Sequence, residues 1–107
     1  MSVNSVQLIG KLGQNPEIKY TQSGDAVLNF SLATDTYRKD AEKKTQWHKI
    51  EIWGKQAENC NKYLQKGSNV FVDGSIDYGN YEKEGVKVYT TTIKAKNIQF
   101  LDEKKND

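Results

Sequence analysis

The chain of 107 residues is poor in the side chains that carry covalent and metal chemistry, with one cysteine, one histidine and one arginine. The single cysteine, Cys60, cannot form an internal disulfide and is expected to pack as a small apolar group. No residues have the clustered spacing of metal ligands. A nuclease would need convergent carboxylates and arginines to stabilise phosphoryl charge, yet Arg38 stands alone. We therefore expect no enzymatic activity, no metal site and no cofactor.

Long apolar runs are also missing. No stretch approaches the roughly 20 residues that a membrane-spanning helix needs. The N-terminal residues MSVNSVQLIGKLGQNP contain no basic segment followed by a long apolar one, so no secretory signal is expected. These absences favour a cytoplasmic protein without a membrane partner.

The charge of the chain is nearly balanced, with 16 basic and 14 acidic residues and a formal net charge of +2. The sequence pI of about 8.6 lies below the values that mark strongly basic nucleic-acid binders. Because all basic residues except Arg38 are lysines, the guanidinium forks that read base edges are nearly absent. Any binding to nucleic acid should therefore depend little on base sequence.

Apolar and polar residues alternate with period two along most of the chain, as in strands with one buried face. We predict strands over Val6–Leu12, Ala26–Tyr37, Thr45–Trp53, Asn69–Tyr78 and Val86–Ala95, with Glu17–Tyr20 extending the sheet.

Apolar residues recur at helical spacing only within Lys55–Gln65, and Gly67 is placed to end that helix. One short helix between strands three and four matches the five-stranded Greek-key barrel called the OB-fold. We therefore predict an all-β, OB-fold domain over residues 1–101 and a short charged tail over residues 102–107.

The strand Thr45–Trp53 carries the most informative pattern. Ile50 and Ile52 point together toward the core, so Trp47, Lys49 and Trp53 point the other way. Two tryptophans on an outward face indicate either a subunit interface or a ligand with flat rings. Nucleobases fit the second reading, since each base stacked on a ring contributes about 1–3 kcal/mol and lysines neutralise phosphates.

Two tyrosines are further stacking candidates. Tyr37 lies at the outer end of its strand, and Tyr81 is expected at the tip of a turn region over Gly79–Gly85. The mixed-charge loop Arg38–Lys44 is either a solvated hairpin tip or a finger that grips phosphates, and Arg38 is counted among the predicted DNA-binding residues. Structural roles are expected for Phe30, Tyr63 and Tyr89, and structural or interfacial roles for Tyr20 and Phe71.

Three runs of sequence carry a family resemblance: LIGKLGQNPEIKYTQSGDAVLNFSLAT, TQWHKIEIWGKQAENCNKYLQKGSNVFVDGSI and VYTTTI. In this order and spacing, the chain resembles bacterial single-stranded DNA-binding proteins over nearly its whole length. The resemblance implies an OB-fold protomer, usually assembled as a homotetramer. It also implies a role in coating and protecting single-stranded DNA during replication, recombination and repair.

The resemblance also implies residue roles. Trp47 and Trp53 fall on base-stacking positions of the family, the second often phenylalanine, and Tyr37 and Tyr81 fall on stacking positions that are often tryptophan. His48, which alternates onto the isoleucine side of its strand, matches a histidine at the family's subunit interface. Basic positions of the family are matched by Lys49, Lys55 and Lys66.

The chain departs from the family pattern in two places. The strand leading to Tyr81 is usually basic, yet residues 76–80 read IDYGN, so we expect a weaker or more salt-sensitive grip there. Family members commonly continue into a long linker and an acidic tip that recruits partner proteins. This sequence stops at LDEKKND, so no recruitment through such a tip is expected of it.

Two other binding functions remain open from the residues. One is a protein-interaction module of the primosome-accessory type, whose aromatic face meets protein partners. The other is an RNA-binding OB domain, which the sequence does not distinguish from a DNA-binding one.

Overall fold

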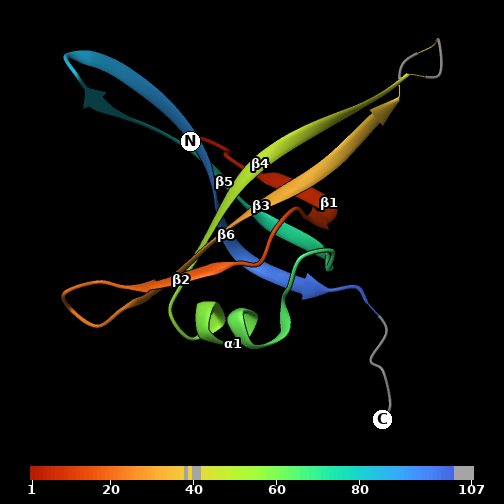
Figure 1. Cartoon of the computed structure of the whole chain (residues 1–107), viewed down its shortest axis with the longest axis horizontal. Helices are drawn as coiled ribbons and strands as arrows, with labels where there is room; N and C mark the ends of the chain where they lie inside the picture. Colours follow the sequence, from red (N-terminus) through yellow and green to blue (C-terminus); the bar gives the residue numbers. More distant parts are fainter. Residues whose placement is uncertain (38, 40–41, 103–107) are drawn as a thin grey trace.

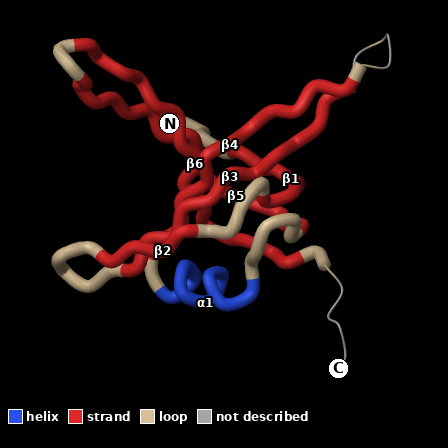
Figure 2. Tube along the Cα trace, viewed as in Figure 1, coloured by secondary structure: helices blue, strands red, loops and turns tan. Residues whose placement is uncertain are grey.

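The computed structural model describes residues 1–37, 39 and 42–102 as strands around one short helix (Figures 1 and 2). Arg38, assigned above to nucleic-acid binding, and residues 103–107 of the predicted tail lie outside the described residues. The elements are β1 (Val6–Leu12), β2 (Glu17–Tyr20), β3 (Ala26–Tyr37), β4 (Lys43–Trp53), α1 (Lys55–Tyr63), β5 (Asn69–Lys83) and β6 (Val86–Phe100).

The sheet closes on itself. Its strand order is β1-β5-β6-β4-β3-β2, and β1 returns to pair with β3 through Lys11↔Ala33 and Leu12↔Leu32. Five strands therefore form the barrel, and β2 is an extra strand that pairs with Ala26–Asn29 of β3. Counted along the chain, the five barrel strands are β1, β3, β4, β5 and β6, and α1 falls between the third and fourth of them, β4 and β5. The predicted five-stranded barrel with one helix in that place is confirmed.

The core follows from the period-two alternation, because every second side chain of each barrel strand points inward. The backbones of β5 and β6 come very close at Gly74, where a Cβ would overlap the backbone of Lys94. The register between the two strands shifts at this point, between Asp73 and Gly74. The buried apolar cluster comprises Leu12, Ala26, Leu28, Phe30, Leu32, Ile50, Ile52, Ala57, Cys60, Leu64, Val70, Val72 and Ile93.

Helix α1 packs at one end of the barrel and begins directly after Gly54, whose φ of 80° suits glycine. The helix ends at Tyr63, two residues earlier than predicted, because Leu64 is already extended. Gly67, with φ of 90°, forms the following turn, and its N–H donates to the Leu12 carbonyl at 2.9 Å. Burial raises the pKa of the Cys60 thiol to about 11, so this cysteine is a protonated packing group.

Two hairpins extend beyond the barrel at the end opposite α1 and diverge from each other (Figure 1). We call them the β3–β4 arm and the β5–β6 arm. The β5–β6 arm is longer than predicted, since β5 continues through Lys83 and β6 starts at Val86. Glu84 and Gly85 turn the chain with φ of 52° and 79°, as a type I′ hairpin turn requires. Tyr81 consequently lies within a strand, paired with Val88, and not in a loop.

Within the described part of the chain, no helix is long and apolar enough to cross a membrane.

Candidate nucleic-acid interface

The outward faces of β3 and β4 form a continuous surface, which we call the barrel wall. Trp47 and Trp53 are 62% and 48% exposed there, whereas Ile50 and Ile52 are buried on the other side of β4. The face assignment made from the sequence is therefore what the structure shows. Directly opposite pairs across this wall are Ala33↔Trp47, Ser31↔Lys49, Asn29↔Glu51 and Val27↔Trp53.

Trp47 lies against the loop that follows β1. A Cβ on Gly13 would overlap the six-membered part of the Trp47 indole, so only glycine lets the ring rest there. The Gly13 backbone is itself held, because its N–H donates to the Ser31 carbonyl at 3.1 Å. Contact with this loop restricts the ring from one side and leaves its other side in solvent.

Trp53, the last residue of β4, is held by a different interaction. Its indole Nε1–H donates to Oε1 of Glu51, two residues earlier on the same face, at 2.5 Å. A hydrogen bond to a carboxylate is stronger than one between neutral groups. Both rings of the wall thus have defined positions.

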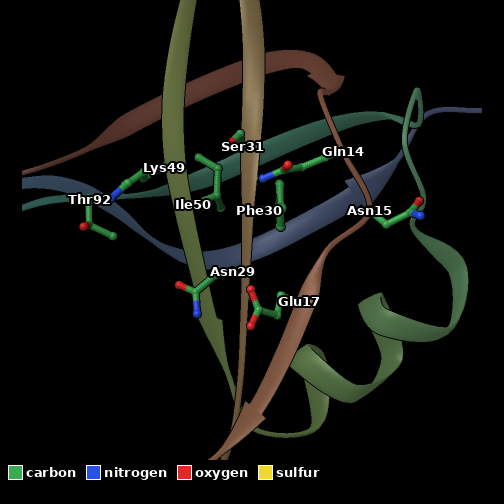
Figure 3. A pocket seen from close by; sticks show the side chains of 9 residues that line it. All are labelled: Gln14, Asn15, Glu17, Asn29, Phe30, Ser31, Lys49, Ile50 and Thr92. Atoms are coloured by element: carbon green, nitrogen blue, oxygen red, sulfur yellow. The ribbon is translucent and has the colours of Figure 1, made fainter.

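A polar hollow of about 400 Å³ opens on the barrel wall beside Lys49 (Figure 3). Amide, hydroxyl and carboxylate groups surround it. They can accept hydrogen bonds from base edges or sugars, and the amide and hydroxyl groups can also donate to them. Its lining residues are Gln14, Asn15, Glu17, Asn29, Phe30, Ser31, Lys49, Ile50 and Thr92.

A second hollow, also of about 400 Å³, lies between β4 and the β5–β6 arm. We call it the aromatic hollow because Trp47, Tyr81 and Tyr89 border it, together with Lys49 and His48. Lys49 thus borders both hollows, and a strand of phosphates that passes from one to the other would meet its ammonium group.

The β5–β6 arm carries more exposed rings than the sequence pattern predicted. Tyr81 is 52% exposed, and Tyr78 and Tyr89 are each about three-quarters exposed. The structural role expected for Tyr89 is therefore wrong. Tyr63 is also exposed, on α1, but its ring packs against the Phe100 ring at a centroid distance of 5.9 Å. Phe30 is buried as expected.

The remaining predicted binding residues are spread out. Tyr37 ends β3 opposite Lys43 on the β3–β4 arm and borders neither hollow. Lys55 is exposed at the start of α1, two residues after Trp53. The Lys66 N–H donates to Asn15 Oδ1 at 2.8 Å, which places Lys66 next to the loop that borders the polar hollow.

The three predicted interface residues, His48, Phe71 and Tyr20, lie on β4, β5 and β2, strands that do not neighbour one another in the sheet. His48 Nε2 hydrogen-bonds the Thr34 hydroxyl at 2.8 Å, and burial lowers its pKa below the usual 6.5. Phe71 pairs with Ile9, an exposed apolar residue that was not predicted from the sequence. Ile9 points outward because side chains alternate along β1, where its neighbour Leu8 points inward.

Among the described residues, no group of three or more histidine, cysteine, aspartate or glutamate side chains could hold a metal ion.

A closed five-stranded barrel with exposed rings and lysines on one wall is the architecture of an OB-fold binding protein. The chain belongs to the single-strand binding protein family, whose model matches residues 3–101. It is a family of binding proteins and not of enzymes, in agreement with the expectation from the sequence.

Curated relatives agree with this assignment. The chain is 43% identical to a "Single-stranded DNA-binding protein" of Xanthomonas campestris over 104 residues, 92% of this chain and 60% of the relative. It therefore spans about 60% of that relative's length. It is also 43% identical to "Single-stranded DNA-binding protein 1" of Xylella fastidiosa over 112 residues, 99% of this chain and 82% of the relative.

A solved structure, "Plasmodium falciparum SSB complex with ssDNA", is similar as well. It matches with a TM-score of 0.90 and 34% identity over 95% of this chain and 97% of that chain. Both the fold and the family are thus shared with a protein solved on single-stranded DNA.

Proposed function

We propose that this protein binds single-stranded DNA, with little preference for sequence, by stacking bases on its exposed rings. The observation that carries the proposal is the exposure of Trp47 and Trp53 on a wall whose opposite face is the packed core. Large aromatic rings in solvent cost free energy unless a ligand covers them. Further support comes from the Plasmodium protein, which has the same fold and was solved in complex with this class of ligand.

Stacking favours a single strand over a duplex, because bases paired in a helix do not expose their faces. Every base has a π-face, so a stacking surface accepts all four. Lysine supplies charge to such a site without the planar fork that reads guanine edges. The chain, in which Arg38 is the only arginine and every other basic residue is lysine, has the composition of a sequence-tolerant binder.

Phosphate contacts on this surface come from Lys49 and, at its margins, from Lys55 and Lys66. The β5–β6 arm adds little net positive charge, since Lys83 and Lys87 at its end stand beside Glu82 and Glu84. We therefore expect the salt dependence of binding to arise mainly at the barrel wall, with each neutralised phosphate adding about −0.7 to the slope of log K against log salt.

The test is a titration of the protein with oligo-dT while tryptophan emission is followed. Both tryptophans of the chain lie on the barrel wall, so stacking should quench the signal. Absence of quenching, together with absence of binding by filter retention, would contradict the proposal. Competition with duplex DNA and with oligo-U then separates single-stranded DNA from duplex and from RNA. A protein-docking role would leave partner capture intact at saturating oligo-dT.

We further propose that the protein works as a homo-oligomer, with four subunits as in the family resemblance, and protects single-stranded DNA in replication, recombination and repair. Support comes from apolar residues that remain exposed away from the barrel wall, among them Ile9 beside Phe71, and Tyr20. Light scattering with and without oligo-dT measures the assembly. A monomer in both conditions would contradict this part of the proposal.

A further inference from the structure

The wall that is proposed to meet phosphates contains a carboxylate, Glu51, at its centre. Glu51 pairs with Asn29 of β3 on one side and with Lys94 of β6 on the other. A negative charge beside a phosphate chain is unfavourable, by an amount that low salt increases. This cost would be offset if the Glu51 carboxylate stabilised another binding group of the wall.

The Glu51 carboxylate has a defined partner, the indole N–H of Trp53. Residues 51 and 53 share a face because strand side chains alternate, and the glutamate side chain is long enough to span two residues along it. Within the described part of the chain, this is the only hydrogen bond of the Trp53 side chain. Trp47 is restrained in another way, by its contact with Gly13.

Trp53 needs a restraint more than a residue in mid-strand does. It is the last residue of β4, and the chain turns away immediately after it at Gly54. An unrestrained indole at a strand end would sample several rotamers, and binding would have to order it. Ordering one side chain at an interface typically weakens binding by about 2- to 10-fold relative to a preorganised one.

Resting on the proposed function, we infer that Glu51 is a positioning residue that holds the Trp53 ring ready for base stacking. The carboxylate accepts the indole N–H in the plane of the ring. The edge of the ring is then occupied by the hydrogen bond, and the π-face stays open. Glu51 thus acts through Trp53 and makes no contact with the DNA that binding depends on.

Three variants separate position from charge. Glu51→Gln keeps an acceptor oxygen at the same reach and removes the charge, whereas Glu51→Ala removes both. Glu58→Gln on α1 removes the same charge from a site away from the wall and serves as the control. We expect Glu51→Gln to bind oligo-dT at least as tightly as the parent protein. Glu51→Ala should bind about 2- to 10-fold more weakly than Glu51→Gln.

A double-mutant cycle locates the effect. Trp53→Phe keeps a ring at position 53 and deletes the N–H donor, so alanine and glutamine at position 51 should then bind equally well. A difference between them that persists in the Trp53→Phe background would overturn the inference. Equal binding of Glu51→Ala and Glu51→Gln in the parent background would overturn it as well.

The free protein provides a readout that needs no DNA. The two indole N–H resonances in a ¹⁵N correlation spectrum are assigned with Trp53→Phe. The Trp53 indole proton should exchange slowly in the parent and in Glu51→Gln, and faster in Glu51→Ala. Unchanged exchange in Glu51→Ala would contradict the positioning role even if oligo-dT binding failed altogether. A failure of the DNA-binding proposal is therefore distinguishable from a failure of this one.

Discussion

The barrel wall and the β5–β6 arm both present aromatic rings, but they restrain them differently. On the wall, Trp47 rests on Gly13 and Trp53 is hydrogen-bonded to Glu51. On the arm, Tyr78 and Tyr89 are about three-quarters exposed, and no side-chain hydrogen bond or ring contact with another described residue restrains them. The wall has the properties of a preformed site, and the arm those of an adaptable one.

Under the proposed function, this difference would let a single barrel bind many DNA sequences. Preformed rings lose little conformational entropy when bases arrive, so they should contribute most of the free energy. Freely exposed rings lose more and contribute less, but they can adjust to different bases and backbone paths. Substitutions on the wall and on the arm can break or sharpen this division.

The largest expected effect is the loss of a wall ring. Trp47→Ala should weaken oligo-dT binding by about 2–3 kcal/mol, and Tyr81→Ala on the arm by only about 1 kcal/mol, within the range for stacked bases. Fluorescence anisotropy of a labelled oligonucleotide at one salt concentration measures both. Tyr63→Ala, which removes an exposed ring on α1, should bind as the parent does. Equal losses for Trp47 and Tyr81 would remove the distinction between wall and arm.

Gly13→Ala should weaken binding by about 1–2 kcal/mol, because its Cβ would push the Trp47 ring from its position and forfeit part of the stacking. The same anisotropy titration measures it. In a Trp47→Ala background, Gly13→Ala should have no further effect on binding, since there is no ring left to displace. A loss that remains in that background would mean that Gly13 acts on the loop and not on the ring.

A smaller effect is expected in the salt dependence. Lys49→Ala should make the slope of log K against log salt shallower by about 0.7, the value for one phosphate contact on a single strand. Lys94→Ala, in the barrel part of β6, should change the slope less, because Lys94 is already paired with Asp77. Lys62→Ala on α1 should leave it unchanged. Titrations at four or more salt concentrations give the slopes.

The smallest effect concerns stability and pH. Burial lowers the pKa of His48 in the folded state below 6.5, so the unfolded chain takes up the proton first as pH falls. Stability should therefore decrease as pH drops through 6.5 and level off below the folded-state pKa. Urea unfolding at about pH 7.5 and about pH 5.5, on either side of the ordinary histidine pKa, measures this. His48 is the only histidine, so His48→Asn should remove this part of the pH dependence.

Alternation of side chains along β4 was enough to predict which residues face the core and which face the wall, because a strand in a closed barrel has one side in the core. The structural role expected for Tyr89 was wrong. Its strand continues past the barrel into the β5–β6 arm, where the side that faces the core lower down meets solvent. Periodicity assigns a residue to a face, but it does not say how far the core extends along that face.

The two restraints on the tryptophans differ in the same way. The bond between Glu51 and Trp53 joins residues two apart on one strand, so a same-face pair of acceptor and donor is visible in the sequence. The contact between Gly13 and Trp47 joins residues far apart in the chain and depends on how the loop after β1 folds over β4. Only the three-dimensional structure brings the second pair together.

The buried thiol of Cys60 has a practical consequence for studying motions of the two arms. With its pKa raised to about 11, it stays protonated and shielded at neutral pH, and the sequence contains no other cysteine. A cysteine introduced at a single surface position can therefore be coupled to a maleimide dye selectively, without first removing a native thiol. Two such cysteines, one on each arm, would carry dyes whose separation reports whether the arms close on a bound strand.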